Sequence, residues 1–401
     1  MKKIISLFTF LFIIGTFLSC SSQKASISFD KKKAVVDNGK KQIKDIPASE
    51  IVKDMTTGWN LGNTLDATGK SGLESETSWG QPKTTKDMID ALAASGIKTI
   101  RIPVTWHNHI DKDYTIEPRW MARVKQIVDW AIEDGLYVII NTHHDNGFSP
   151  DNLIPGSGYY PSSKNLEESE RFLLNIWSQI ALTFNNGYDE HLIFEIMNEP
   201  RLAGTEFEWW WANENNETCK DAAKTLNKLN QEVLDVIRKS GGNNKIRLVS
   251  VAGLMASPER TLSSLFEIPQ DKVKNHLAIS IHMYSPYSFA MENPGLTEYT
   301  PDLRQQNSEV FAQLNAKFIM NGYPVIIGEY GATNKNNLED RIEWFSDYIA
   351  DTRKYGICCC VWDNGIAAVH GNDYSEHYGY FNRKELNWYF PEILKAIKDN
   401  L

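Results

Sequence analysis

Two glutamates end short apolar runs of this sequence, and their type and position suit acid–base chemistry. Glu199 follows the run Leu192–Asn198, and Glu329 closes the run Val325–Glu329. Glutamate is rarely buried without a partner, so each is either an ion-pair or capping residue or a working acid. Two carboxylates across one sugar-sized gap cleave a glycosidic bond with retention when they are about 5–5.5 Å apart, and with inversion at about 6.5–9.5 Å. The sequence spacing leaves both outcomes open.

Other polar residues lie beside these glutamates or interrupt the other apolar runs. Glu199 is predicted to be a general acid/base whose pKa is raised by its surroundings, and Asn198 to donate a hydrogen bond to substrate. Arg101 interrupts the apolar run Thr99–Val104. Its guanidinium can keep Glu329 ionised through charged hydrogen bonds, and a structural ion pair is the alternative.

His282 and Tyr284 lie two positions apart in the run Ala278–Tyr284, and therefore on one face of a strand. We expect the hydroxyl of Tyr284 to reach Glu329, and His282 to orient a carboxylate or a sugar hydroxyl. Either residue alone is more often part of a core. Their alternation in step with a polar strand end favours a role in the site.

Three more residues at strand ends suit contact with a sugar. His143 and His144 end the third apolar run, and adjacent side chains of a strand diverge, whereas a catalytic zinc needs three converging ligands. We therefore predict hydrogen bonds from both histidines to sugar hydroxyls, and no metal. Trp362, at the end of Ile357–Trp362, is predicted to form an apolar platform beneath the sugar, with core packing as the alternative.

The composition favours a neutral substrate and no cofactor. The 12 Trp, 16 Tyr and 17 Phe include flat apolar faces of the kind that stack on sugar rings, although aromatic residues also build cores. The formal net charge is −9 and the main basic cluster is Lys31–Lys33, which argues against nucleic acid as a partner. Neither a Gly-rich phosphate loop nor a Gly-x-Ser-x-Gly motif is present in the sequence.

These residues fall on a regular alternation of short apolar runs with longer amphipathic stretches, which predicts β-α units around a parallel sheet. The predicted strands are Gly58–Gly62, Thr99–Val104, Tyr137–His143, Leu192–Asn198, Ile246–Ala252, Ala278–Tyr284, Val325–Glu329 and Ile357–Trp362. The predicted helices are Lys86–Ala94, Trp120–Glu133, Ser169–Phe184, Ala222–Lys239, Asn307–Met320, Leu338–Lys354 and Pro391–Lys398, with a short, uncertain segment Pro258–Phe266. This order matches a (β/α)8 barrel, whose catalytic groups gather at the carboxyl ends of the strands; an open doubly wound sheet is the alternative.

The first residues are typical of an export signal, with two lysines and then an apolar run, Ile4–Phe17, that is too short for a comfortable membrane span. Cys20 followed by two serines resembles a bacterial lipoprotein cleavage and lipidation site, although Phe17 and Leu18 depart from that pattern; cleavage and release is the alternative. We expect a signal peptide over 1–20 with Cys20 as the lipidated first mature residue, a flexible tether over 21–47, and one catalytic domain over 48–401. The remaining cysteines are predicted to be small buried hydrophobes without a disulfide.

An ordered set of motifs runs from about Ile51 to the end of the chain. It consists of Gly58–Asp66, Arg101–Trp106, Asn141–His144, Phe194–Pro200, His282–Pro286, Ile327–Glu329 and Trp362–Gly365. The set resembles glycoside hydrolase family 5, and looks closest to its subfamily 4 endoglucanases from anaerobic gut and rumen bacteria and clostridia.

The resemblance implies a retaining mechanism, with Glu199 as acid/base and Glu329 as nucleophile. It also implies that Asn63 and Asp66 bind sugar on the non-reducing side. Trp209, in a loop unusually rich in tryptophan for the family, is a candidate for the leaving-group side. The residues Arg101, His143, His144, Asn198, His282, Tyr284 and Trp362 match family positions, and the resemblance implies that they belong to the substrate-binding site.

The expected activity is endo-hydrolysis of β-1,4-glucan backbones, with cellulose, mixed-linkage glucan and xyloglucan all within range. A β-mannanase or xylanase of the same clan is one alternative. A non-catalytic glycan-binding lipoprotein is another, but such proteins have usually lost one carboxylate and both are present here. We expect a monomer, exported and either lipid-anchored at the bacterial cell envelope or surface, or secreted, with no other membrane contact.

Overall fold

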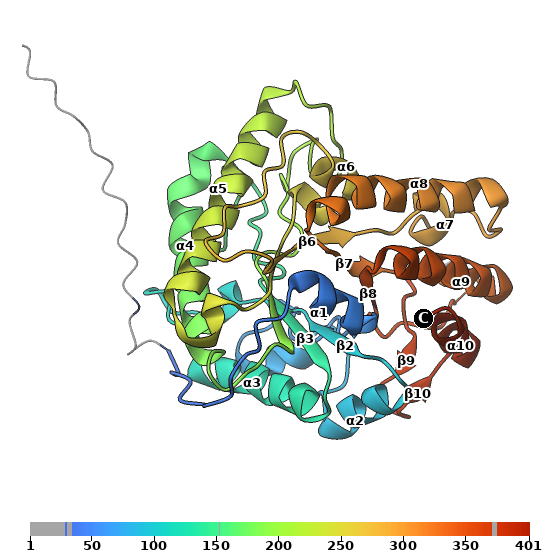
Figure 1. Ribbon diagram of the computed structural model, residues 1–401, viewed down its shortest axis with the longest axis horizontal. Helices are drawn as coiled ribbons and strands as arrows, with labels where there is room; N and C mark the ends of the chain where they lie inside the picture. The colour runs from blue at the N-terminus through green and yellow to red at the C-terminus, as the bar shows by residue number, and fades with distance from the viewer. Residues whose placement is uncertain (1–28, 30–33, 152, 371–374) are drawn as a thin grey trace, which may run out of the picture.

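Eight parallel strands form the closed barrel of this chain (Figure 1), in the order β1 to β8 with β8 paired to β1. The computed structural model of the 401-residue chain describes residues 29, 34–151, 153–370 and 375–401. The strands are β1 (Thr57–Asn60), β2 (Thr99–Ile102), β3 (Tyr137–Asn141), β4 (Leu192–Glu195), β5 (Val249–Val251), β6 (Leu277–His282), β7 (Val325–Tyr330) and β8 (Cys358–Val361). The (β/α)8 prediction is confirmed, and the open-sheet alternative is wrong because both edges of the sheet are paired.

A ring of helices covers the outside of the barrel. Its members are α2 (Lys86–Ala94), α3 (Pro118–Glu133), α4 (Leu166–Thr183), α5 (Glu217–Lys239), α6 (Pro258–Thr261), α8 (Pro301–Lys317), α9 (Leu338–Tyr355) and α10 (Pro391–Asp399). Local residues set several ends: the Thr85 hydroxyl accepts the Met88 N–H at the start of α2, and Gly356 takes the left-handed conformation (φ +67°) that ends α9. The uncertain segment after β5 contains only the single turn α6.

The helix α1 (Ala48–Met55), which the sequence pattern did not predict, closes the N-terminal end of the barrel. Its buried face is Ala48, Ile51, Val52 and Met55, and this face packs in one apolar cluster with side chains of β3, β4, β6, β7 and β8. In Figure 1, α1 lies at the centre of the ring of strands. Burial of a large apolar side chain contributes about 1.5–3 kcal/mol, so the buried face of α1 makes a substantial contribution to the stability of the core. The opposite, carboxyl end is left for substrate.

The cysteines of β8 alternate between two apolar clusters, as the strand period requires. Cys358 and Cys360 belong to the cluster that contains α1, and Cys359 to the larger cluster between strands and outer helices. Cys219 is buried in α5, and all four are free thiols. The prediction of small buried hydrophobes is confirmed for these four.

The segment 37–47 is fixed to the N-terminal end of the barrel. The Asp37 carboxylate accepts the backbone N–H groups of Asn185 and Gly187, Lys44 pairs with Glu190 at 2.9 Å, and Ile43 is 8% exposed. Asp45 also lies 2.9 Å from Nε2 of His276. The predicted tether over 21–47 is therefore wrong from Asp37 onward, because its charged side chains have partners on the barrel.

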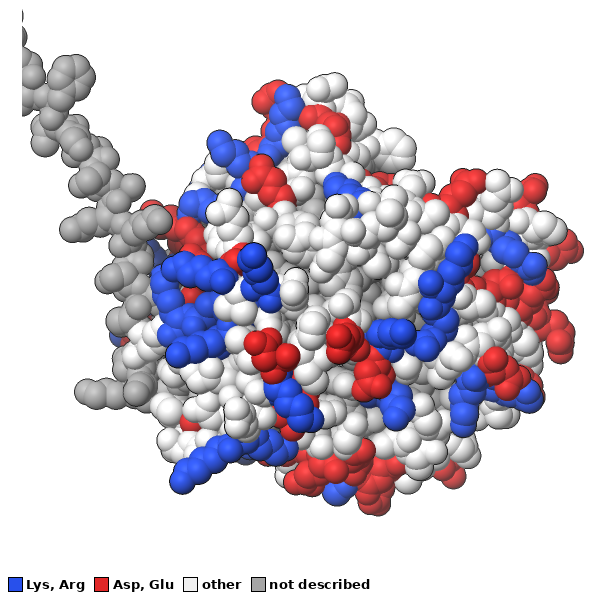
Figure 2. Space-filling model, viewed as in Figure 1, with Lys and Arg blue, Asp and Glu red and all other residues white. Residues whose placement is uncertain are grey.

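The face closed by α1 carries mixed charge (Figure 2). Lys and Arg side chains are interspersed with Asp and Glu across it. This face therefore lacks the extended basic surface that nucleic-acid binding requires. Among the described residues, no helix has the length and apolarity needed to cross a membrane.

Candidate active site

Glu199 and Glu329 meet at the carboxyl end of the barrel. Glu329 lies in β7, and Glu199 follows the end of β4. His282, at the end of β6, bridges them: its Nδ1 is 2.8 Å from Oε1 of Glu199 and 3.6 Å from Oε2 of Glu329. One oxygen of each carboxylate and one ring nitrogen of His282 all lie within 4.8 Å of one another. Oxygens this close to one another agree with a retaining pair, whose carboxyl groups lie about 5–5.5 Å apart.

Arg101 is the hub beneath this pair. It is fully buried in β2, and its Nη1 donates to Oε1 of Glu329 at 2.7 Å. The same guanidinium donates to Asn60, Glu195 and Asn198. Burial lowers the pKa of Arg101, but the charges of the two carboxylates outweigh burial and raise it. The structure therefore confirms the predicted contact with Glu329, whereas direct sugar binding by Arg101 is wrong because the side chain has no exposed surface.

Tyr284 completes the surroundings of Glu329. Its hydroxyl donates to Oε2 of Glu329 at 2.9 Å, which confirms the predicted contact. Burial, and then the charge of Glu329, raises the pKa of Tyr284 well above its usual value, so the hydroxyl keeps its proton. Glu329 thus accepts one charged and one neutral hydrogen bond, and both stabilise its ionised form.

The protonation of Glu199 differs from the sequence prediction. Burial raises its pKa, but the hydrogen bond and charge of His282, with nearby arginines, outweigh burial and leave the pKa below its usual value. Nδ1 of His282 carries the hydrogen of this bond, because Nε2 lies 3.3 Å from Nη2 of Arg101, which can only donate. The predicted raised pKa of Glu199 is therefore wrong for the free protein.

His143 has a fixed tautomer. The Val104 N–H donates to Oδ1 of Asn141, so Nδ2 of Asn141 is the group that lies 3.1 Å from Nδ1 of His143 and donates to it. Nδ1 is therefore an acceptor, and Nε2 carries the hydrogen. Burial lowers the pKa of His143 well below its usual value, so the ring is neutral. The side chain is a hydrogen-bond donor through Nε2.

His143 and His144 lie side by side, contrary to the expectation that they diverge. Their ring centroids are 4.4 Å apart, because β3 ends at Asn141 and both histidines lie beyond the strand. With Asp66 they form a group whose ligand atoms lie within 4.8 Å. A metal on His143 would nevertheless have to displace the Nε2 hydrogen while Nδ1 accepts from Asn141, which leaves an imidazolate. This donor set is poorly suited to a metal.

Asp66 holds a loop beside the two histidines. It is fully buried, and its carboxylate accepts the N–H groups of Asn63 and Thr64 at 3.0 and 2.6 Å. Burial raises the pKa of Asp66 to about 6. Asn63 is partly exposed with φ +55°, a left-handed conformation that these bonds support. Direct sugar binding by Asp66 is therefore wrong for this structure, and its role is to position Asn63.

The remaining predicted contact residues surround the pair. Oδ1 of Asn198 accepts from Arg101 at 2.6 Å, which leaves its amide N–H groups as donors. Trp362 is 8% exposed and lies parallel to the ring of His143, with centroids 5.8 Å apart. The imidazole of His144 is one-third exposed and packs against Trp79.

Trp209 lies farther out, on the loop after β4. It is 58% exposed, and the guanidinium of Arg201 lies 4.8 Å from its ring centroid. Arg201 also bonds to Glu208 at 3.0 Å, which holds the guanidinium against the indole. An exposed aromatic ring on a fixed support is suited to stacking on a sugar.

Three polar residues beneath the site escaped sequence analysis: Glu195, Asn60 and Asn141. They lie inside the predicted apolar runs, each is the last residue of its observed strand, and all are fully buried or nearly so. Nδ2 of Asn60 donates to the carbonyl of Gly328 at 2.9 Å, and Nδ2 of Asn141 donates to Glu195 at 2.8 Å. A polar residue within an apolar strand was the available signal, since an unpaired one would be costly to bury.

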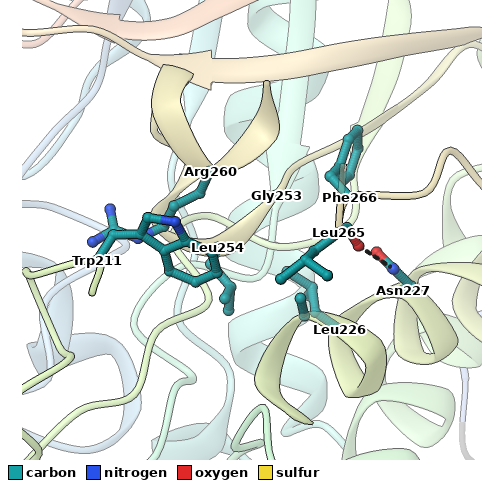
Figure 3. A pocket seen from close by; sticks show the side chains of 9 residues that line it. Trp211, Leu226, Asn227, Gly253, Leu254, Arg260, Leu265 and Phe266 are labelled. Carbon is teal, nitrogen blue, oxygen red and sulfur yellow. Dashed lines mark hydrogen bonds between the residues drawn. The ribbon is translucent and has the colours of Figure 1, made fainter. Parts of the chain in front are cut away.

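A separate pocket between α5 and the segment after β5 is shown in Figure 3. It is lined mainly by apolar side chains around Trp211 and Arg260, whose guanidinium lies 5.7 Å from the Trp211 ring centroid. Its lining residues include no carboxylate. The pocket therefore has no part in the chemistry of Glu199 and Glu329. The predicted lipidation residue Cys20 lies outside the described residues.

Comparison with known proteins agrees with this geometry. The sequence profile of Cellulase (glycosyl hydrolase family 5) matches residues 65–368. Endoglucanase B of Ruminococcus albus is 44% identical over 354 residues, which cover 88% of this chain and 80% of that protein. Endoglucanase A of Clostridium longisporum is 41% identical over 360 residues, covering 87% of this chain and 65% of that protein.

Two solved structures are also similar to this chain in sequence and in fold. A lichenase from Caldicellulosiruptor sp. F32, in complex with cellotetraose, has a TM-score of 0.82 and 42% identity, with 91% of this chain and 98% of that chain covered. A subfamily 4 broad-specificity endoglucanase from Ruminococcus champanellensis, with bound cellotriose, has a TM-score of 0.80 and 38% identity, with 89% and 99% covered. Profile, sequence and fold agree over most of the chain, and this chain belongs to glycoside hydrolase family 5.

Proposed function

We propose that Glu329 is the nucleophile and Glu199 the acid/base with which this chain, an endo-acting β-glucan hydrolase, cleaves internal β-1,4 bonds. The observation that carries the proposal is the separation of the two carboxylates, with His282 bonded to Glu199 and within 3.6 Å of Glu329. Glu329 accepts hydrogen bonds from Arg101 and Tyr284, whereas Glu199 is 20% exposed and open to proton exchange. The two carboxylates are therefore suited to different roles.

The reaction has two balanced steps. In the first, a Glu329 oxygen bonds to the anomeric carbon as the bond to the leaving-group oxygen breaks, and that oxygen takes a proton from Glu199. In the second, water attacks the same carbon, Glu199 takes a proton from it, and the bond to Glu329 breaks. Each step inverts the anomeric carbon, so the overall reaction retains its configuration.

Substrate contacts are assigned by position and donor capacity. Asn63, His143, His144 and Asn198 are proposed to donate hydrogen bonds to sugar hydroxyls, with His143 acting through Nε2. Trp362 is proposed to lie beneath the sugar at the cleavage point, and Trp209 to line the leaving-group side. A complex of a Glu199→Gln variant with cellotetraose tests these contacts, and a bound chain that avoids this face would contradict them.

The substrate range is tested by a product profile. Purified protein is expected to release oligosaccharides of several lengths early from carboxymethyl cellulose, mixed-linkage glucan and xyloglucan, because an endo enzyme cuts at internal positions. Galactomannan and xylan serve as parallel substrates for the mannanase and xylanase alternatives. Predominant release of a single short product, or faster cleavage of galactomannan or xylan, would contradict the proposal.

The pH dependence is expected to differ between the free enzyme and its complex. Bound sugar covers the exposed part of Glu199 and strengthens the burial that already raises its pKa. Activity requires the protonated acid and is lost as pH rises through this pKa. The basic limb of kcat, which reports the complex, should therefore lie at higher pH than that of kcat/KM, which reports the free enzyme. If the basic limbs of kcat and kcat/KM lay at the same pH, bound substrate would not change the pKa of Glu199, and this prediction would be wrong.

For localisation, we propose export and lipidation at Cys20, which suits an enzyme whose polymeric substrate lies outside the cell. The support is the sequence pattern of the first residues. Wild-type protein expressed in a bacterium is expected in the membrane fraction with a lipid on its N-terminal peptide, and a Cys20→Ser variant is not. Equal membrane association of the two would contradict lipid anchoring.

A further inference from the structure

Glu195 is a buried carboxylate of the site with no part in the two steps above. It lies at the end of β4 and is 1% exposed. Its Oε2 accepts from Nε of Arg101 at 2.8 Å and from Asn141 at 2.8 Å, and lies 2.7 Å from the charged Nη2 of Arg101; its Oε1 accepts from the Ser280 hydroxyl at 2.6 Å. Glu195 is thus surrounded by donors, as an ionised carboxylate requires.

Arg101 therefore places one positive charge between two buried carboxylates. Glu195 engages two of its nitrogens, whereas Glu329 accepts from Nη1 alone at 2.7 Å. The packing here is close, since a Cβ on Gly328 would lie 3.2 Å from Oε1 of Glu195. Glu329 therefore interacts with only part of the positive charge of Arg101.

The sharing of this charge matters for a nucleophile. An adjacent arginine lowers a carboxyl pKa by about 1–3 units, and a carboxylate stabilised that strongly is a weaker nucleophile. If Glu195 were neutral, Arg101 would pair with Glu329 only. The arrangement gives Glu329 one charged hydrogen bond without directing the whole positive charge of Arg101 onto it.

We propose that Glu195 is a positioning residue that fixes the Arg101 guanidinium and shares its charge, and thereby sets the nucleophilicity of Glu329. The inference rests on the proposed role of Glu329. It goes beyond that role because it assigns a function to a carboxylate that substrate does not touch.

The test is a Glu195→Gln variant, which removes the charge with little change in size. Its kcat on mixed-linkage glucan is expected to fall about tenfold to a hundredfold with KM changed less than about threefold, because the lost effect acts on the transition state. The acidic limb of its pH profile is expected to move to lower pH, because the full positive charge of Arg101 then acts on the site. Glu195→Asp, which keeps the charge, should return this limb towards the wild-type position.

A Glu76→Gln variant is the matched control. Glu76 is also 1% exposed and accepts from Arg123 at 2.7 and 2.8 Å, but it bonds to no residue of the site. This control is expected to lose thermal stability but to keep the wild-type acidic limb. An unshifted limb in Glu195→Gln, or an equal shift in Glu76→Gln, would overturn the proposal.

A further measurement separates this inference from the assignment of Glu329 itself. A 2-deoxy-2-fluoro cellobioside with a good leaving group should label wild type on Glu329 and label Glu195→Gln on the same residue more slowly. Labelling of another residue in wild type would refute the nucleophile assignment. Equal labelling rates on Glu329 would refute only the role of Glu195.

Discussion

Replacement of Glu329 by glutamine is expected to lower kcat on mixed-linkage glucan by about 10⁵-fold, the order of loss seen when a covalent nucleophile is removed. Glutamine keeps an oxygen that can accept from Nη1 of Arg101, so the hub beneath the site is retained. The neutral amide cannot form the glycosyl-enzyme, however. The loss corresponds to about 7 kcal/mol of transition-state stabilisation, which exceeds the effect expected from misplacement of substrate alone.

The Glu76→Gln variant again controls for loss of a buried, arginine-bound charge. It is expected to remain within about threefold of wild-type kcat, because most effects away from the site act on stability. The role of Glu329 is tested further with Glu329→Ala and azide on an activated cellobioside. Azide should occupy the vacated space and give an α-glycosyl azide, the product of a single inversion. Retained hydrolysis in Glu329→Gln, or a β-azide, would remove Glu329 from the mechanism.

The fold was predictable because the barrel strands are buried on both faces and therefore appear as continuous apolar runs. All eight runs became strands; seven of them end earlier than predicted, and β7 extends one residue past Glu329. His143, which closes one of these runs, and Glu199, which follows another, lie in loops, where side chains no longer alternate. That difference explains why His143 and His144 lie together and not on opposite faces.

The site was predictable to the extent that polar residues end apolar runs, and less so where a role depends on a neighbour distant in sequence. The contact of Arg101 with Glu329 was expected, because a buried guanidinium requires an anion. Glu195, which holds the other side of that guanidinium, lies within its strand, and no local pattern connects the two residues. The burial of Asp66 likewise depends on how its own loop folds back.

The same limit explains the error in the pKa of Glu199. A strand-end carboxyl in an apolar setting is expected to have a raised pKa, and burial is indeed the largest single influence here. The sequence does not show that the imidazole of His282 stands 2.8 Å from Oε1. The acid form must therefore be favoured by bound substrate, and the variants of Glu199 test this directly.

Replacement of Glu199 by alanine is expected to lower kcat/KM on mixed-linkage glucan by about 10²–10⁴-fold, the usual contribution of a general acid. The loss should depend on the leaving group. From 2,4-dinitrophenyl cellobioside the dinitrophenolate departs without protonation, so the Glu329 ester should form at a rate near that of wild type. That ester should then accumulate, because no base activates water, and a burst of dinitrophenol should precede slow turnover.

Azide distinguishes the two carboxylates by the configuration of the product. In Glu199→Ala, azide needs no base and should react with the Glu329 ester, which restores turnover and gives a β-glycosyl azide after two inversions. The pH profile of this variant should also lose its basic limb, because the acid that titrates there is gone. An α-azide would mean that the roles are reversed. If dinitrophenyl and polysaccharide substrates lost rate equally, with no burst, Glu199 would instead act only in binding or positioning. Glu199 is partly exposed and can exchange its proton, whereas Glu329 accepts two hydrogen bonds from buried groups. These positions predict the β product.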